Sequence, residues 1–328
     1  MTELRAGLIG LGMMGRHHAR VLREITGVEL VAVADEMGDP HNVAGSTPFC
    51  RTVDELLEHN LDMAVVAVPT AFHAAVGLAL AEAGVHALIE KPIANTAEEG
   101  AQLAAAFESR GLVGAVGHIE RFNPALQSMR ERISAGDLGA VYQIATRRQG
   151  PFPARIADVG VVKDLGTHDI DSTAWLAQSA YSSVFAQTAL KSGRPHEDLV
   201  VVTGRLANNV ITNHLVNWLS PLKERVTIAT GEKGSFVADT LTADLTFFEN
   251  GTVETLWDPI SAFRGVAEGS MIRYALKKRE PLLVEHEAFR DAVLGLRNDI
   301  VTMRDGLATL RVAEAAIKSS KNGQVVSL

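Results

Sequence analysis

The segment DLGTHDID, residues 164–171, joins a carboxylate to an imidazole at a spacing that suits acid–base chemistry. If the segment is helical, Asp164 and His168 lie at positions i and i+4 on one face, with Asp171 close to that face. A carboxylate beside an imidazole orients the ring and raises its basicity, as a general base near neutral pH requires. The alternative to a catalytic pair is a helix N-terminus that has acidic residues in its first turn and a capping histidine. One turn holds too few ligands for a metal ion, so we expect no metal site.

A second reactive side chain, Lys91, follows an apolar run in HALIEKPIANT, residues 86–96. If residues 86–89 form a buried strand, Glu90 and Lys91 occupy its carboxyl end, where doubly wound sheets bind their ligands. Pro92 prevents further strand pairing at this point. A lysine placed there could donate to a substrate hydroxyl or exchange a proton with it. A solvated lysine in a surface turn is the alternative on spacing alone.

The segment GLGMMG, residues 10–15, has the spacing G-x-G-x-x-G and lies between an apolar run and a helical pattern. Glycines so spaced allow a tight turn, close approach of a pyrophosphate to backbone N–H groups, and close packing of the helix on the strand. The helix N-terminus also favours the phosphate charge. An ordinary strand-to-helix turn is the alternative. We expect cofactor contacts from Gly10, Gly12, Met13, Met14 and Gly15.

An acidic residue, Asp35, follows the apolar run LVAVA and lies 20 positions after Gly15. This is the place of the carboxylate that binds the ribose hydroxyls in dinucleotide sites. The carboxylate would repel a 2′-phosphate, and residues 36–39 contain no lysine or arginine to neutralise one. We therefore predict NAD rather than NADP as the cofactor.

Residues 1–118 alternate short, continuously apolar runs with helical patterns, which is typical of a parallel sheet covered on both faces. Gly84 and Gly111 follow two of the helical patterns, and Thr96 with Glu99 forms a capping box. The sequence predicts an α/β fold that starts with a doubly wound, Rossmann-type domain over residues 1–118.

In residues 119–328 the regular alternation of apolar runs and helical patterns ends. We assign these residues to a second, α+β domain with a large, mostly antiparallel sheet. Asn123-Pro124 marks the start of a helix. Hairpin turns are predicted at Asn208-Asn209 and Asn250-Gly251, and helices around 286–297 and 300–320. The helices of this domain cover one face of the sheet and leave the other face exposed. Such a face commonly mediates self-association, so we expect a homodimer or homotetramer.

The bulk composition excludes several classes of protein. The 328 residues are 47% hydrophobic and carry a net charge of −8 without a long basic run, which argues against nucleic-acid binding. The single cysteine, Cys50, has no partner for a disulfide or a zinc site and fits a reducing compartment. No apolar run is long enough to span a membrane, and no signal peptide is evident, so we expect a cytoplasmic protein.

Five segments together resemble the Gfo/Idh/MocA family of NAD(P)-dependent oxidoreductases: GLIGLGMMGRHHA, VAVPTAFHAAV, EKPIA, GHIERFNP and DLGTHDID. They occur in the family's order and span essentially the whole chain. The resemblance implies hydride transfer between a nicotinamide and a ring carbon of a sugar or cyclitol. Val161-Val162-Lys163 stands where many members carry glycines, which leaves the local geometry before residue 164 open.

The resemblance also implies roles for individual residues. Asp164 and His168 match the family's catalytic pair, and Lys91 would lie beside the substrate hydroxyl and the nicotinamide. His168, oriented by Asp164 and aided by Lys91, would then remove the hydroxyl proton, and the lysine charge would stabilise the developing alkoxide. Glu90 would contact the cofactor or hold the turn. The cofactor pocket would also be lined by Pro69, Thr70 and His73.

Several arginines bear on the substrate. Arg147, Arg148 and Arg155 would place guanidinium groups near the pocket, where they match the charge of a phosphate or carboxylate. Lys223 and Arg225 could add contacts, with a solvated strand entry as the alternative. The segments around these residues resemble the family branch that oxidises the 3-hydroxyl of UDP-N-acetylglucosamine. Substrate contacts are expected from Lys91, Arg121, Asn123, Arg148, Arg155, Asp164 and His168.

Two other functions stay open at this point. A dehydrogenase of a free cyclitol or monosaccharide would use the same Lys91, Asp164 and His168 but would not need the arginines. A regulator that binds NAD without catalysis would need the glycine loop and Asp35 alone. Turnover with a panel of sugars distinguishes these functions.

Overall fold

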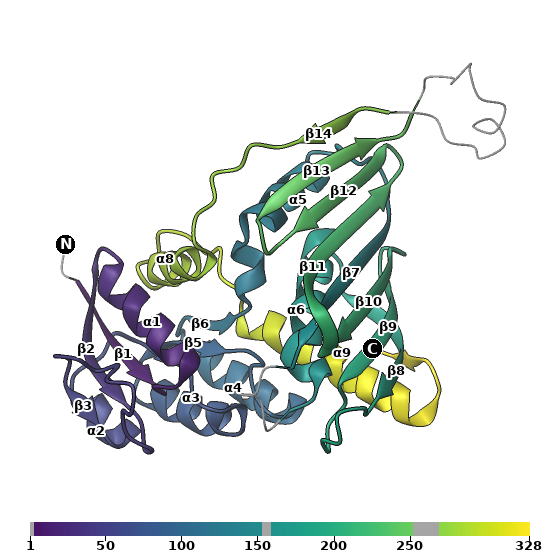
Figure 1. Cartoon of the computed structure of the whole chain (residues 1–328). Coiled ribbons are helices and arrows are strands. Elements are labelled where there is room, and N and C mark those ends of the chain that lie inside the picture. Colours follow the sequence, from purple (N-terminus) through teal and green to yellow (C-terminus); the bar gives the residue numbers. More distant parts are fainter. Residues whose placement is uncertain (1–2, 153–158, 252–268) are drawn as a thin grey trace, which may run out of the picture. The chain divides into compact units, whose positions relative to one another are not determined.

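Two units make up the chain in this computed structural model, which describes residues 3–152, 159–251 and 269–328 (Figure 1). Unit 1 comprises Met1–Ile119 and Glu280–Arg311, and unit 2 comprises Glu120–Arg279 and Val312–Leu328. The sequence had assigned residues 280–311 to the second domain, whereas in the structure they pack with the first unit. None of the described helices is long and apolar enough to cross a membrane.

Unit 1 is built on a parallel sheet of six strands, in the order β3-β2-β1-β4-β5-β6. Its strands are buried because helices cover both faces, which explains the continuous apolar runs. The prediction of a doubly wound parallel sheet is confirmed. The strands are β1 (Leu4–Ile9), β2 (Val28–Ala34), β3 (Phe49–Cys50), β4 (Met63–Val66), β5 (His86–Glu90) and β6 (Gly114–Gly117).

The helices of unit 1 begin and end where local signals place them. Thr96 and Glu99 form the predicted capping box, and Gly84 and Gly111 end two helices at φ values of +76° and +65°. The helical elements are α1 (Met13–Glu24), α2 (Val53–Leu57), η1 (Thr70–Phe72), α3 (His73–Glu82), α4 (Ala97–Ser109), α8 (Pro281–Val293) and the first part of α9 (Met303–Asn322).

Unit 2 contains a nine-stranded sheet in the order β14-β13-β12-β11-β7-β10-β9-β8-β15. Neighbouring strands are antiparallel except β7 and β10, which are parallel, so the predicted mostly antiparallel sheet is confirmed. The strands are β7 (Val141–Pro151), β8 (Tyr181–Ala189), β9 (Leu199–Leu206), β10 (Ile211–Asn217), β11 (Leu219–Gly231), β12 (Gly234–Asp239), β13 (Asp244–Glu249), β14 (Met271–Arg273) and β15 (Val326–Ser327).

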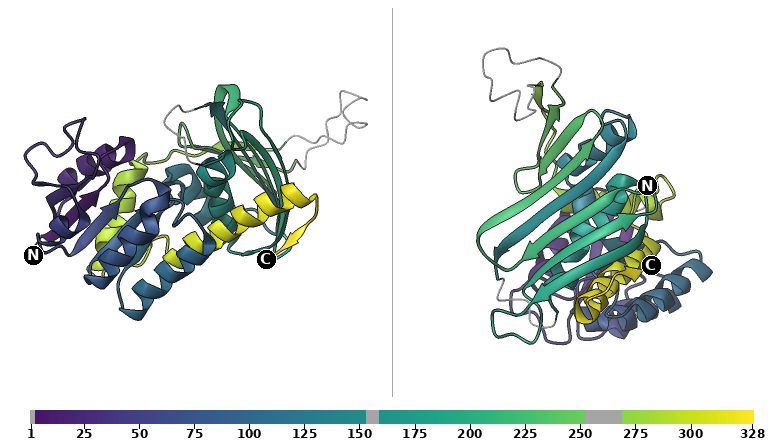
Figure 2. Two further views of the ribbon diagram at one scale, coloured as in Figure 1. Left: turned by 90° about the horizontal axis from the view of Figure 1, so that it is seen from below. Right: turned by 90° about the vertical axis from the view of Figure 1, so that its right-hand side faces the viewer.

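Helices of unit 2 pack on one face of this sheet (Figure 2). Along β9, Val200 and Val202 point into the core, while Val201 faces away from it. The helical elements are η2 (Ile119–Phe122), α5 (Pro124–Ser134), the π-helical turn η3 (Val162–Gly166), α6 (Thr167–Ala177) and the last part of α9.

Two of the sequence signals in unit 2 are confirmed, and one lies partly outside the described residues. Asn123 caps α5 by accepting a hydrogen bond from the Ala125 N–H. The turn at Asn208-Asn209 connects the antiparallel strands β9 and β10. The residues after Gly251 that would complete the other predicted hairpin fall in the segment 252–268, which is outside the description.

Candidate functional site

The glycine loop follows β1 and leads into α1, and its three glycines meet different demands. Gly10 has a φ of +93°, and a Cβ there would lie 2.5 Å from the carbonyl carbon of Ala67. A Cβ on Gly15 would lie 1.9 Å from the Gly10 carbonyl oxygen. A Cβ on Gly12 would meet no protein atom within 4 Å. The chain itself therefore requires the first and third glycines, and the open space at Gly12 fits a ligand that approaches the backbone.

The start of α1 offers backbone donors to an anion. No side chain caps the helix at Gly12, and its first turn, which begins with Met13 and Met14, contains no acidic residue. The four N–H groups at the start of a helix have no partner within the helix, and together with the helix dipole they favour a negative charge. This end of α1 therefore fits a pyrophosphate.

Asp35 lies directly after β2 and holds the glycine loop through its carboxylate. One oxygen, Oδ2, accepts a hydrogen bond from the Leu11 N–H at 2.7 Å, and Oδ1 accepts one from the Met37 N–H at 2.9 Å. Because the carboxylate is bonded to the loop itself, it has a defined orientation beside the open space at Gly12. A carboxylate in this place fits the ribose of a bound dinucleotide.

The predicted cofactor residues Pro69, Thr70 and His73 lie at the start of η1 and α3, next to the carboxyl end of β4. The buried ring of His73 reaches two backbone carbonyl groups, Val68 O at 2.9 Å from Nε2 and Pro92 O at 2.8 Å from Nδ1. A carbonyl oxygen only accepts, and burial lowers the pKa of His73, so a neutral ring donates to one carbonyl at a time. In this structure His73 braces the chain after β4 against the chain after β5.

Lys91 follows the last residue of β5, at the carboxyl end of a buried parallel strand as predicted. The peptide bond between Lys91 and Pro92 is cis. Glu90 turns its carboxylate back to the chain, where Oε2 accepts a hydrogen bond from the Lys91 N–H at 3.1 Å. Its other oxygen, Oε1, lies 3.0 Å from Nε2 of His18. Glu90 thus holds the turn that presents Lys91.

Sequence reasoning missed His18 as part of this site, although helical periodicity could have found it. The apolar face of α1 includes Met14, Val21, Leu22 and Ile25, and His18 falls on the same face at helical spacing. The structure buries His18 completely. The sequence signal for such a residue is a histidine on the apolar face of the helix that follows the glycine loop.

In unit 2, Asp164 lies in the π-helical turn η3 and His168 in the first turn of α6. Both residues are helical, but Asp164 lies in a π turn, so the i and i+4 spacing of a regular α-helix does not describe the pair. Turns of this kind are frequent at functional sites. Both side chains are buried, with exposed fractions of 4% and 9%. Among the residues that the structure describes, no group of three or more His, Cys, Asp or Glu side chains is arranged to hold a metal ion.

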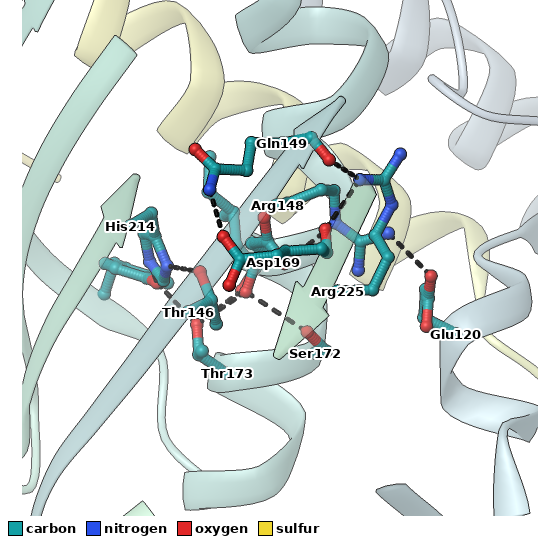
Figure 3. A network of polar contacts seen from close by, with 12 residues as sticks. Glu120, Thr146, Arg148, Gln149, Asp169, Ser172, Thr173, His214 and Arg225 are labelled. Carbon is teal, nitrogen blue, oxygen red and sulfur yellow. Dashed lines mark hydrogen bonds and ion pairs between the residues drawn. The ribbon is translucent and has the colours of Figure 1, made fainter. Parts of the chain in front are cut away.

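The residue after His168 is anchored to β7 by a buried arginine. Arg148 donates from Nε to Asp169 Oδ1 at 3.0 Å and from a terminal nitrogen to Glu120 Oε1 at 2.7 Å (Figure 3). Burial alone would lower the pKa of Arg148, but the charges of Asp169 and Glu120 outweigh it and raise that pKa. The guanidinium is therefore charged and already engaged by two carboxylates of the chain.

A second arginine holds the same helix. Arg121 of η2 binds Asp171 of α6 through two hydrogen bonds, of 2.8 Å and 2.6 Å. Such bidentate pairs fix geometry as well as charge. With Arg148 on Asp169, both carboxylates that follow His168 are held by arginines, so the first turns of α6 are anchored from two directions.

Neutral hydrogen bonds extend this network behind α6. The hydroxyl groups of Thr173 and Tyr181 lie 2.7 Å apart, and His214 lies 2.8 Å from both Tyr181 and Thr146 (Figure 3). Burial lowers the pKa of His214 to about 3, so its ring is neutral. This chain of contacts connects α6 to β8, β10 and β7.

The other predicted substrate residues that the structure describes are engaged by groups of unit 2 or exposed to solvent. Asn123 caps α5 and donates to the Thr240 carbonyl at 3.0 Å, and Arg225 donates to the Gln149 carbonyl at 2.8 Å. Arg147 is half exposed and pairs with Glu224 at 3.2 Å. Lys223 is exposed, and Arg155 lies outside the described residues. Substrate contacts by these residues stay predictions.

Comparison with known proteins accounts for both units. Residues 4–118 match the oxidoreductase family with an NAD-binding Rossmann fold, and residues 130–328 match the C-terminal α/β domain of the same oxidoreductase family, Gfo/Idh/MocA. Among curated relatives, UDP-N-acetylglucosamine 3-dehydrogenase of Acidithiobacillus ferrooxidans is 31% identical over 97% of this chain and 96% of its own length. The scyllo-inositol 2-dehydrogenase (NAD(+)) of Bacillus subtilis is 26% identical over 99% and 96%.

Solved structures give the same assignment. UDP-N-acetylglucosamine 3-dehydrogenase from Acidithiobacillus ferrooxidans superimposes with a TM-score of 0.86 at 28% identity, covering 98% of this chain and 99% of the other. GenD2 from gentamicin A biosynthesis, in complex with NAD, superimposes with a TM-score of 0.83 at 26% identity, covering 100% and 97%. With the open glycine loop and Asp35 in place, this chain belongs to the Gfo/Idh/MocA family and is an NAD-dependent oxidoreductase.

Proposed function

We propose that the protein is a dehydrogenase that oxidises a ring-carbon hydroxyl of a nucleotide sugar, with the 3-hydroxyl of UDP-N-acetylglucosamine as the first candidate. The observation that carries this proposal is the full-length similarity to a UDP-N-acetylglucosamine 3-dehydrogenase, at 31% identity. The chain also contains Lys91, Asp164 and His168, the three residues to which we assign the reaction.

We assign the chemistry to three side chains. Oxidation of the hydroxyl breaks its O–H and C–H bonds; the proton goes to His168, which Asp164 orients. The ammonium of Lys91 stabilises the negative charge that develops on the substrate oxygen. NAD, when bound, supplies the acceptor for the hydride. The anchoring of α6 by Arg148 and Arg121 supports this assignment, because it keeps the base in one orientation.

Oxidation of a free cyclitol or monosaccharide is the second candidate. The similarity to a scyllo-inositol 2-dehydrogenase over nearly the whole chain favours it. So does the engagement of Arg148 by Asp169 and Glu120, because a guanidinium held by two carboxylates is less available to a diphosphate. Lys223 and Arg155 are the basic side chains that a nucleotide sugar would then use.

Cofactor reduction across a substrate panel tests the proposal. Purified protein is mixed with NAD and with UDP-N-acetylglucosamine, other UDP-sugars, free N-acetylglucosamine, glucose and inositols, and NADH is followed by absorbance. Turnover with UDP-sugars but not with the free sugars supports the proposal. Turnover with inositol alone supports the second candidate. Tight NAD binding without turnover on any member of the panel favours a regulator without catalysis.

Substitution of the assigned residues tests their roles. We expect Lys91→Met and His168→Asn each to lower kcat by about 100-fold or more, because general acid–base catalysis contributes factors of about 10² to 10⁴. The dissociation constant of NAD, measured by calorimetry, should change little for His168→Asn. His17→Asn, an exposed change on α1, is the control. Near-normal turnover of both variants would refute the assignment.

We also propose that the protein self-associates through the solvent-facing side of the nine-stranded sheet. Tyr142 on β7 and Val201 on β9 are 54% and 43% exposed on strands whose buried residues form the core of unit 2. A second copy of the same sheet would cover such a surface. Light scattering tests this: we expect a dimer or tetramer for the native chain and a smaller mass for Val201→Glu. A native monomer at micromolar concentration would contradict it.

A further inference from the structure

Behind Lys91, unit 1 contains a row of buried ionisable side chains that the proposed chemistry does not use. His18 of α1 is completely buried and lies between two partners. Its Nε2 is 3.0 Å from Glu90 Oε1, and its Nδ1 is 2.8 Å from Nε2 of His286 on α8. The row thus runs from the turn that presents Lys91 to a helix that the sequence assigned to the other domain.

The chemistry of these groups determines which atom donates to Glu90. An ionised carboxylate only accepts, so His18 donates from Nε2 to Glu90. The second ring nitrogen of His18, Nδ1, shares one hydrogen bond with Nε2 of His286. Burial, with the nearby His18, lowers the pKa of His286 well below its usual value, so this ring is neutral. His18 therefore presents a donor to Glu90 while its other ring nitrogen is engaged by His286.

Glu90 depends on this row for its charge. Burial alone would raise the pKa of Glu90, but the hydrogen bond and charge of His18, together with Lys91, lower it. Gly117, which pairs with Glu90 in the sheet, leaves room for the carboxylate: a Cβ there would lie 3.3 Å from Glu90 Oε2. The carboxylate is therefore fixed between the β6 backbone, the imidazole of His18 and the Lys91 N–H.

The surrounding groups make His18 the principal support of this charge. Glu285 of α8 is buried, forms no hydrogen bond among the described residues, and has its pKa raised by burial and by the charge of Glu90. Burial therefore favours its neutral form. His73 of α3 is coupled to Glu90 by charge alone, and its ring nitrogens face the carbonyl groups of Val68 and Pro92.

We propose that His18 is a positioning residue of the Lys91 site. It holds the Glu90 carboxylate ionised and aimed at the Lys91 N–H, and His286 fixes the orientation of the His18 ring. The carboxylate in turn orders the turn that presents the Lys91 side chain, on whose charge stabilisation of the substrate oxygen depends. This inference rests on the proposed role of Lys91 in the oxidation of a ring hydroxyl.

Two amide substitutions at His18 separate its hydrogen bond from its bulk. In His18→Gln, the side-chain amide nitrogen reaches the place of Nε2 and can still donate to Glu90. In His18→Asn, the amide ends near the place of Nδ1 and does not reach the carboxylate. Both variants lack the imidazole, so any difference in their properties is due to the hydrogen bond to Glu90. His17→Asn, at the exposed neighbouring position, controls for a change in α1.

The first measurement does not depend on turnover. The carboxyl carbons of glutamate are labelled with ¹³C and titrated by NMR in the protein without cofactor, and Glu90 is assigned by comparison with Glu90→Gln. We expect the Glu90 midpoint to rise by about one pH unit or more in His18→Asn, because a buried carboxylate that loses a donor favours its neutral form. His18→Gln and His17→Asn should titrate like the native protein.

The second measurement follows kcat against pH with the substrate that the panel identifies. In His18→Asn we expect kcat at pH 8 to fall by about tenfold, because Glu90 is no longer held against the turn that presents Lys91 and small displacements of a catalytic group reduce the rate strongly. His18→Gln should restore kcat. NAD affinity should be equal in all variants, which verifies that unit 1 is folded.

An unchanged Glu90 midpoint in His18→Asn overturns the inference, whether or not the enzyme turns over. A raised midpoint with an unchanged kcat in His18→Asn overturns the connection to Lys91. Failure of the proposed function has a different signature: the Lys91→Met variant keeps its activity, or no sugar is oxidised, while the NMR titration still reports the bond between His18 and Glu90.

Discussion

Arg148 and Asp169 form a buried ion pair, with 3.0 Å between Nε and Oδ1, that connects the middle of the nine-stranded sheet to the residue after His168. Glu120 binds the same guanidinium at 2.7 Å. A dehydrogenase needs its base at a constant distance from the substrate, because small displacements of a catalytic group reduce the rate strongly. The pair therefore fixes the backbone of α6 next to His168, the residue that we propose as the base.

We predict that Arg148→Met lowers the free energy of unfolding of unit 2 by about 3–5 kcal/mol, because it leaves two carboxylates buried without their partner. Arg147→Met changes the neighbouring residue, which is half exposed and pairs with Glu224, so it should cost less than about 1 kcal/mol. Urea unfolding followed by circular dichroism measures both. Equal losses in the two variants would contradict the structural role of Arg148.

The glycine loop provides a second matched pair. Gly15→Ala places a methyl group 1.9 Å from the Gly10 carbonyl oxygen, so we predict a lower melting temperature as well as weaker NAD binding. Gly12→Ala meets no protein atom within 4 Å and should fold normally but bind NAD at least about tenfold more weakly, because the methyl group occupies space that the pyrophosphate needs. Calorimetry and thermal unfolding test both changes. Native NAD affinity in Gly12→Ala would show that the cofactor does not approach this residue.

Asp35→Ser should weaken NAD binding by about tenfold or more, because hydrogen bonds to a charged group contribute about 1.5–3 kcal/mol. The change removes the acceptor for the Leu11 N–H and the partner of the ribose hydroxyls. It should also narrow the preference for NAD over NADP, since the repulsion of a 2′-phosphate is lost. Calorimetric titration with both cofactors measures this, with the exposed neighbour Glu36→Gln as control. Similar affinities of the native protein for the two cofactors would refute the predicted preference.

The buried His214 predicts a pH dependence of stability. Its folded pKa of about 3 lies below the ordinary 6.5, so the unfolded chain binds more protons and stability falls as the pH drops from 6.5 toward 3. At pH 5 this histidine alone should cost about 2 kcal/mol relative to pH 7. His214→Gln should be less stable than the native protein at pH 7 but lose less stability between pH 7 and pH 5. Parallel urea unfolding at the two pH values measures the difference, and equal losses would contradict the prediction.

The features that the sequence predicted correctly depend on local patterns. Continuous apolar runs identify the strands of a parallel sheet, and the glycine spacing with Asp35 identifies the dinucleotide site, because both are encoded within about 30 residues. The π turn at Asp164 was not predicted, since a single extra residue in a helical turn has no distinct periodicity.

The features that sequence reasoning missed depend on contacts between distant segments. Arg148 was predicted to bind substrate because a guanidinium suits a phosphate. Its partner Glu120 is 28 positions away in the sequence, so no local pattern indicated the ion pair. His18 and His286 are separated by 268 positions, so no local pattern connects them. A buried charge reveals its partner only when the fold brings the two elements together.

The division of unit 1 into two stretches of the sequence has a consequence for synthesis on the ribosome. Phe289 of α8 completes one of the cores of unit 1, and the Val116 N–H donates to the Val301 carbonyl at 2.9 Å. Both later residues are translated after most of unit 2. The nucleotide-binding unit, although its glycine loop emerges first, must therefore wait with an exposed core until nearly the whole chain has been made, and nascent or truncated chains that end before Pro281 present that core to chaperones and proteases.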